Sequence, residues 1–290
     1  MKKLKFKRLL VIILLTTFSF SYSQGKAKVQ KISNNIYSIS IFHYNSLVVI
    51  GDKGVLVVDP ANSYRAQLIQ KEINKLTTLP VTHVVLSHEH YDHIGGTEVF
   101  PNAQIYAQNN ARSIFKLDVR GITPKRVDNW FETDATIMMG KTRVNLHHYG
   151  AGDGVASSIV HLPKENVVYC VDMFVNGAIT EGKWLEDSNL LGVRKILNNL
   201  TALNPKYVVN GHSDGLDPKH LIKASQFYND LYDAIAPTMI KATKKGYLET
   251  MEAIKTLPKT TELRQHKDLK NYDSLPTHVY RMAMAIFHGG

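Results

Sequence analysis

The feature that most constrains the fold of this chain is a largely apolar run, residues 81–86, that leads directly into a polar segment, residues 87–96. An apolar run of this length predicts a strand that is covered on both faces. The polar segment places three histidines and an aspartate within six positions: His88, His90, Asp92 and His93. Packing does not explain such a cluster, because buried polar groups cost free energy unless they are paired. The pattern therefore predicts a polar site at the end of a buried strand.

Strands and helices are expected along both halves of the chain. In the first half, strands are predicted at residues 36–41, 45–50, 54–58 and 81–86, with a helix at residues 63–76. In the second half, strands are predicted at residues 144–146, 157–162, 167–171 and 207–210, with helices at residues 191–203, 220–244 and 280–287. Two halves of this kind indicate two sheets that pack together, with helices outside them.

The first residues carry an export signal. Five cations between Lys2 and Arg8 precede an apolar run, residues 9–17, which leads into small residues at 19–23. This order is typical of a secretory signal peptide. We therefore predict a signal peptide over residues 1–23, a single mature domain over residues 24–290, and a periplasmic or secreted protein. Because the apolar run is too short to span a bilayer, no stable membrane anchor is expected after cleavage.

Composition argues against several classes of partner. Cleavage of the signal would remove five cations and no acids, which halves the formal net charge of +10. No basic cluster with interleaved aromatic residues is found in the sequence, so a nucleic-acid partner is not expected. The single cysteine, Cys170, has no partner for an internal disulfide and is predicted to pack as a small hydrophobic residue. The expected partner is a small-molecule substrate.

The polar segment has the composition of a metal site. Imidazole nitrogen and carboxylate oxygen are the ligands that zinc prefers. In an extended stretch His88 and His90 project to the same side, because side chains alternate along a strand. The turn that follows would bring Asp92 and His93 to a neighbouring position, so that one segment serves two adjacent sites. The plain alternative is a solvated, histidine-rich loop, which this spacing after a buried strand does not favour.

These residues resemble the metallo-β-lactamase superfamily, whose hallmark is His-x-His-x-Asp-His after a β-strand. The resemblance extends to Asp59 after Val57-Val58, which has a structural role in the family, to Asp172 after Tyr169-Cys170-Val171, which bridges two metals there, and to His212 after Gly211. It implies an α+β fold, the four-layer αββα sandwich, with the metals at one edge between the sheets. It also implies a zinc cofactor of two ions, with iron or manganese as alternatives.

One family motif is altered in this chain. The family has Gly-His-Thr before a strand that ends in Leu-Pro, and counting back from Leu162-Pro163 places Asp153 at the histidine position. Asp153 would then bind the first metal through oxygen, whereas His148 is the alternative ligand. Asp153 could also be a turn residue, because glycine flanks it on both sides. Val171 replaces the glycine that usually precedes the bridging aspartate, which could crowd the site.

The expected chemistry is hydrolysis. A metal with an open position lowers the pKa of bound water to about 7, and the resulting hydroxide attacks a carbonyl carbon. Asp92 is the predicted catalytic residue, since it would orient that nucleophile and pass a proton to the leaving group. An oxygen ligand at Asp153 would weaken the first metal as a Lewis acid and favour iron or manganese. The sequence predicts an exported hydrolase of a β-lactam, a lactone or another ester.

Two alternatives remain beside this prediction. The first is a metal-binding protein of the same fold with weak or lost catalysis, and the second is a periplasmic lipid or sulfate-ester hydrolase. A serine hydrolase is not supported, because the sequence has no Gly-x-Ser-x-Gly motif. Loops near residues 43–44, 128–130 and 177–184 are expected to form the substrate pocket, lined by Trp130, Phe131 and Trp184.

Overall fold

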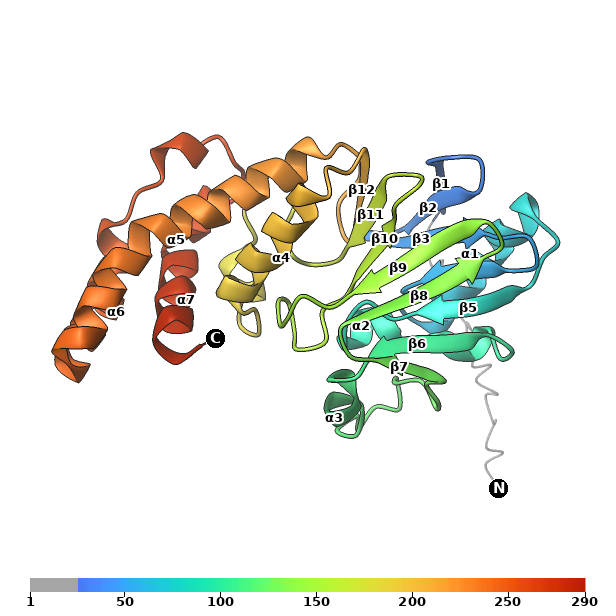
Figure 1. Ribbon diagram of the computed structural model, residues 1–290, viewed down its shortest axis with the longest axis horizontal. Helices are drawn as coiled ribbons and strands as arrows, with labels where there is room; N and C mark the ends of the chain where they lie inside the picture. The colour runs from blue at the N-terminus through green and yellow to red at the C-terminus, as the bar shows by residue number, and fades with distance from the viewer. Residues whose placement is uncertain (1–25, 290) are drawn as a thin grey trace, which may run out of the picture.

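Two β-sheets form the centre of the protein in the computed structural model, which describes residues 26–289 (Figure 1). The predicted signal peptide, residues 1–23, lies outside the described residues. The first sheet has seven strands in the order β1-β2-β3-β4-β5-β6-β7, and the second has five in the order β12-β11-β10-β9-β8. The α+β sandwich expected from the sequence is thus confirmed.

The first sheet changes from antiparallel to parallel at its centre. Its antiparallel strands are β1 (Lys28–Lys31), β2 (Ile36–Ile41), β3 (Tyr44–Ile50) and β4 (Val55–Val58). Strands β5 (Val81–Val85), β6 (Gln104–Gln108) and β7 (Asn129–Phe131) continue it in parallel. Helix α1 (Ser63–Leu76) connects β4 to β5, and it begins where the Asn62 side chain accepts a hydrogen bond from the Arg65 amide. The parallel part therefore directs the ends of β4 and β5 to the same edge.

The second sheet comprises β8 (Asp134–Met139), β9 (Thr142–His147), β10 (Ile159–Leu162), β11 (Val167–Cys170) and β12 (Tyr207–Asn210). Its strands are antiparallel except for the pair β11 and β12, which helix α4 (Leu190–Ala202) connects. Because β11 and β12 are parallel, the residues that follow both strands also meet at one edge of the sheet.

Three apolar clusters account for the layers. One joins the facing sides of the two sheets and contains Leu47 and Val58 of the first sheet and Leu146 and Val160 of the second. A second cluster lies between the first sheet and α1, and a third lies between the second sheet and helices α4, α5 (Lys219–Lys245) and α7 (Leu275–His288). Cys170 is fully buried in the third cluster, as expected for a small hydrophobic residue.

The C-terminal helices extend the molecule beyond the sheets, as the orange and red segments of Figure 1 show. Helix α6 (Tyr247–Thr260) was not predicted, because only Gly246 separates it from α5 and the helical pattern runs on without a loop. Helix α7 begins earlier than predicted, at Leu275, because Pro276 fits the first helical turn. None of the helices within residues 26–289 combines the length and apolar character that crossing a bilayer requires.

Candidate metal centre

The predicted ligands come from the ends of several strands. His88 and His90 follow β5, and Asp92 and His93 lie in the short helix α2 (Tyr91–Ile94). Asp172 follows β11 and His212 follows β12, while Asp153 belongs to the connection between β9 and β10. The fold therefore gathers at one edge of the sandwich residues that are far apart in the sequence.

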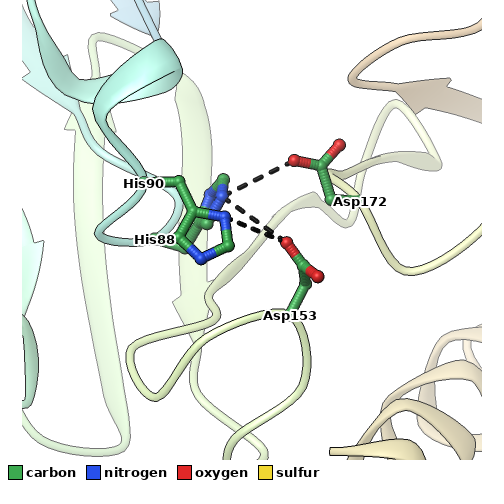
Figure 2. Close-up of side chains that lie close together, drawn as sticks. All are labelled: His88, His90, Asp153 and Asp172. Atoms are coloured by element: carbon green, nitrogen blue, oxygen red, sulfur yellow. Dashed lines mark ion pairs between the residues drawn. The ribbon is translucent and has the colours of Figure 1, made fainter. Parts of the chain in front are cut away.

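The first ligand group comprises His88, His90 and Asp153, with Asp172 beside them, and Figure 2 shows the four side chains converging. One ligand atom from each lies within 4.8 Å of the others. Nδ1 of His90 is 3.1 Å from Oδ2 of Asp153, and Nε2 of His88 is 3.5 Å from Oδ2 of Asp172. Nitrogen and oxygen donors that converge at this spacing suit a divalent cation.

His88 is held in the form that a metal requires. Its Nδ1 lies 2.9 Å from the Ser87 hydroxyl, whereas its Nε2 is buried without a hydrogen-bond partner. Burial, with the neighbouring charges of His93 and His90, lowers the pKa of His88 to about 4, so the ring stays neutral. A buried nitrogen without a partner is costly unless a ligand satisfies it, and a metal ion at this position would do so.

The second ligand group comprises Asp92, His93 and His212. The Nε2 atoms of His93 and His212 face each other at 3.1 Å, and Oδ2 of Asp92 is 3.6 Å from Nε2 of His93. Two imidazole nitrogens and a carboxylate that point at one position form a second set of donors for a cation.

Asp172 lies between the two groups. Its Oδ1 is 3.0 Å from Nε2 of His212, and its Oδ2 is 3.2 Å from Nε2 of His93 as well as close to His88. Burial raises the pKa of Asp172, but the charge of His93 and the hydrogen bonds from His212 and His93 outweigh burial and hold it well below its usual range. The backbone of Asp172 is in the left-handed region, at φ 61°, which is uncommon for a residue other than glycine.

Asp59 supports the site from beneath. The backbone amide and hydroxyl of Ser87 both donate to its carboxylate, at 2.8 and 2.6 Å, and the Tyr169 hydroxyl donates at 2.8 Å. Nδ1 of His93 is 3.5 Å from the same carboxylate. The buried charge of Asp59 is thus fully paired, and it links Ser87 and His93 into one fixed unit.

Tyr44, which the sequence placed in a pocket loop without a role of its own, and Glu89, which it did not single out, also contact the site. The Tyr44 hydroxyl donates to Oδ2 of Asp92 at 3.2 Å, and the guanidinium carbon of Arg65 lies 4.6 Å from the centre of the Tyr44 ring. Glu89 accepts hydrogen bonds from the amides of Val155 and Ala156, at 2.6 and 3.0 Å, and so fixes the loop that carries Asp153. Neither residue type indicates such a contact in the sequence, because tyrosine is common in strands and Glu89 lies between the two predicted ligands His88 and His90.

His148 and Val171, which the sequence also singled out, lie outside the ligand groups found within residues 26–289. Nδ1 of His148 lies 2.8 Å from the Ser157 carbonyl oxygen. Val171 does not crowd the ligands, since its side chain packs in the core between the sheets. A Cβ atom at Gly211 would lie 2.8 Å from Val171, so glycine is required opposite it.

A cavity of about 760 Å³ opens over the two groups. Its lining includes His90, Asp92, Asp153, Asp172 and His212 from the two groups, together with Tyr44 and Trp184. The prediction that Trp130 and Phe131 line the pocket was wrong, because the ring of Trp130 stacks near Phe115 and Arg112, and Phe131 is buried between the sheets.

Comparison with known proteins agrees with this arrangement. The family model of the Metallo-beta-lactamase superfamily matches residues 41–212. The chain is 25% identical over 236 residues to a type 2 metallo-beta-lactamase of Elizabethkingia meningoseptica, covering 75% of this chain and 91% of that protein. It is 24% identical over 213 residues to the 2,4-dinitroanisole O-demethylase subunit beta of a Nocardioides species, covering 72% and 65%. The chain belongs to the metallo-beta-lactamase superfamily.

Solved structures show the same fold. A metallo-beta-lactamase from Pontibacter korlensis superimposes with a TM-score of 0.61 at 20% identity, and the match covers 71% of this chain and 100% of that one. The structure of a metallo-beta-lactamase named IND-7 also gives a TM-score of 0.61, at 22% identity. Since these matches cover nearly all of the other chains but not of this one, this chain has additional residues beyond the shared fold.

Proposed function

We propose that this protein is an exported hydrolase that holds two divalent metal ions, one in each ligand group, and cleaves a carbonyl substrate in the cavity above them. The observation that carries the proposal is the position of Asp172. Its Oδ1 faces His212 of the second group, and its Oδ2 faces both His93 of the second group and His88 of the first, as a bridging ligand would. Zinc suits both groups, since each has two imidazoles and a carboxylate. Iron or manganese remain alternatives in the first, where Asp153 supplies oxygen.

The residues of the chain have distinct parts in this reaction. Metal ions in these groups would supply Lewis acidity and activate a water molecule. His88, His90 and His212 would bind them through ring nitrogens, and Asp172 would hold the two positions at a fixed separation. Asp92 is half exposed at the floor of the cavity, where its carboxylate can orient a water molecule and transfer its proton toward the leaving group. The Tyr44 hydroxyl fixes one oxygen of Asp92 and leaves the other for this task.

The charge around the cavity favours uncharged substrates. Glu181, Glu186 and Asp187 line its mouth, and Lys183, the lysine of the lining, lies with its Nζ 2.6 Å from Glu181. Arg120 and Lys125 instead line a neighbouring cavity that shares Asp92 with this one. Apart from the metal positions, a negatively charged substrate group would therefore meet more carboxylates than cations around the cavity. This supports a lactone or a neutral ester over an anionic β-lactam, although relatives of this chain are named as β-lactamases.

Metal analysis combined with a substrate panel tests the proposal. Elemental analysis of the purified mature protein should find two ions per chain, and the protein should hydrolyse p-nitrophenyl acetate or a lactone faster than nitrocefin. Asp92→Asn serves as the control for turnover by this site. Two bound ions without turnover of any ester, lactone, β-lactam or activated aryl ether would instead support a metal-binding protein that has lost catalysis. Absence of bound metal under metal-replete conditions would contradict both.

Export requires its own test. The arrangement of cations, apolar residues and small residues over residues 1–23 supports cleavage close to Gln24. Mass spectrometry of protein from the native cell envelope should find a mature chain that begins there. An intact Met1 on that protein would contradict export by cleavage.

A further inference from the structure

Asp153 differs from the histidine it replaces in one physical respect. An imidazole presents a single nitrogen to a metal and is oriented by its other nitrogen, whereas a carboxylate has two equivalent oxygens and can turn between them. An aspartate ligand at this position therefore needs a partner that fixes which oxygen faces the cation. The partner must lie on the side away from His88 and His90.

Ser188 occupies that side. Its hydroxyl donates to Oδ1 of Asp153 at 2.7 Å, and both side chains are buried. The other oxygen, Oδ2, is left 3.1 Å from Nδ1 of His90 and 3.9 Å from Nε2 of His88. The serine hydrogen bond thus separates the two oxygens of Asp153 into one that is fixed and one that faces the ligand group.

The preceding residue contacts the other ligand of the same group. Oδ2 of Asp187 lies 3.1 Å from Nε2 of His90, the ring nitrogen opposite to the one that faces Asp153. A carboxylate on the far nitrogen of a histidine ligand fixes its tautomer and raises its donor strength. Two consecutive residues therefore contact two of the three ligands in the first group.

The loop that carries this pair is attached to the C-terminal helix. The Arg281 guanidinium in α7 donates to the Ser188 carbonyl oxygen at 3.1 Å. The Asn189 side chain donates to the Gly289 carbonyl oxygen at 3.0 Å, and the amide of Gly182 donates to the Ser274 hydroxyl at 3.2 Å. Helix α7 lies beyond residues 41–212, the part that matches the family model.

We propose that Asp187 and Ser188 are positioning residues that adapt the first ligand group to an aspartate, and that α7 holds them in place. This inference rests on the proposed metal-binding function, and it assigns to the C-terminal helices a part in metal binding. Without the pair, Asp153 would turn between its two oxygens and His90 would lose its orientation, so that the first ion would bind more weakly than the second.

Metal affinity of the full-length mature protein tests the proposal without reference to turnover. Zinc is titrated in competition with a chromophoric chelator, which resolves two successive ions. Ser188→Ala and Asp187→Asn should each weaken one ion by about 10- to 100-fold, the usual effect of removing an outer partner of a ligand, and leave the other unchanged. Ser188→Thr should retain the affinity because it keeps the hydroxyl. Glu186→Gln, on the same loop, should leave the affinity of both ions unchanged, because Glu186 belongs to none of the ligand groups that residues 26–289 form.

A double substitution separates positioning from a general structural role. In the Asp153→His background, the ligand has no second oxygen that could replace the first, so Ser188→Ala should lower the affinity of the weaker ion less than it does in the wild-type background. An equal loss in both backgrounds would overturn the role of Ser188. Arg281→Met should weaken the same ion as Ser188→Ala while unfolding stays cooperative, and unchanged binding would overturn the role of α7.

The outcomes also separate this inference from the proposed function. Wild-type protein that binds two ions, with Ser188→Ala and Asp187→Asn binding both equally tightly, would overturn the inference alone. Wild-type protein that binds no ion would overturn the proposed function together with the inference.

Discussion

The hydroxyl of Tyr44 donates a hydrogen bond to Oδ2 of Asp92 across 3.2 Å, from the first residue of β3 to the short helix α2. The same ring lies edge-on to His93 and His212, with ring centres 5.6 and 4.6 Å away. Tyr44 therefore contacts every ligand of the second group. Burial, together with the charge of Asp92, raises the pKa of Tyr44 to about 12, so its hydroxyl remains a donor at physiological pH.

Tyr44→Phe should lower kcat/KM by roughly tenfold, because a hydrogen bond to a charged group contributes about 1.5–3 kcal/mol and Asp92 would lose its fixed orientation. Steady-state kinetics on the best ester substrate measures the change. Tyr64→Phe is the matched control, since it removes a hydroxyl from a half-exposed residue outside the ligand groups. If both variants had the same kcat/KM, Tyr44 would have no part in the reaction.

His88→Ala should abolish binding of the first ion and reduce turnover together. Its Nε2 is buried with no hydrogen-bond partner, and its Nδ1 contacts the Ser87 hydroxyl, so alanine would remove one polar contact from the fold. Elemental analysis of protein dialysed against metal-free buffer gives the number of ions per chain, and circular dichroism checks that the variant is folded. Full occupancy in this variant would refute the assignment of His88 as a ligand.

Much of this arrangement followed from the sequence, for identifiable reasons. The strand over residues 81–85 and the cluster after it share one short segment, so local periodicity and ligand spacing were enough to predict them. Helix α1 was predicted at its observed bounds because apolar residues recur at helical spacing among charged residues. Asp172 and His212 required the family resemblance, since nothing local brings them to His93.

The parts that were missed depend on contacts between distant segments. Ser188 and Asp187 read as ordinary loop residues, and only folding places them against Asp153 and His90. Tyr44 was expected in a pocket loop, but its hydrogen bond to Asp92 was missed for the same reason. Trp130 was expected at the pocket because aromatic residues line many binding sites, but its ring instead packs with Phe115 and beneath Arg112. A pattern along the chain does not specify such partners.

A buried histidine outside the ligand groups predicts how stability depends on pH. His278 in α7 packs edge-on against Phe227 and is fully buried, and burial lowers its pKa to about 4. The unfolded chain therefore binds a proton near pH 6.5 that the folded chain does not bind until about pH 4. The contribution of neutral His278 to stability is therefore present above pH 6.5 and is lost as the pH falls toward 4.

His278→Gln should flatten this dependence. Between pH 7 and pH 5 the wild-type free energy of unfolding should fall by about 2 kcal/mol more than that of the variant, since each unit of pKa difference corresponds to about 1.4 kcal/mol. Urea denaturation of both proteins at the two pH values measures the difference, and the titration of other groups cancels in the comparison. If the free energy of unfolding changed equally between the two pH values in both proteins, His278 would not be the cause of the pH dependence.

The substitution of Asp153 decides whether its carboxylate is a metal ligand. Asp153→Asn keeps the size and the hydrogen bond from Ser188 but weakens the donor, so the first ion should bind at least tenfold more weakly. Asp153→His should retain two ions and shift the preference toward zinc. Because a neutral nitrogen leaves the metal more electron-poor than a carboxylate does, activity should also rise at a lower pH.

His148→Ala is the control that completes this test. Nδ1 of His148 is engaged by the Ser157 carbonyl oxygen at 2.8 Å and lies outside the ligand groups, so its removal should leave the metal content unchanged. Zinc titration of the Asp153→Asn, Asp153→His and His148→Ala proteins, alongside the wild type, gives the comparison. If His148→Ala lost an ion while Asp153→Asn kept two, the loop would have to rearrange on metal binding, with His148 and not Asp153 as the third ligand. If the two Asp153 variants and the wild type matched in affinity and pH profile, the carboxylate would serve only the turn between Gly152 and Gly154.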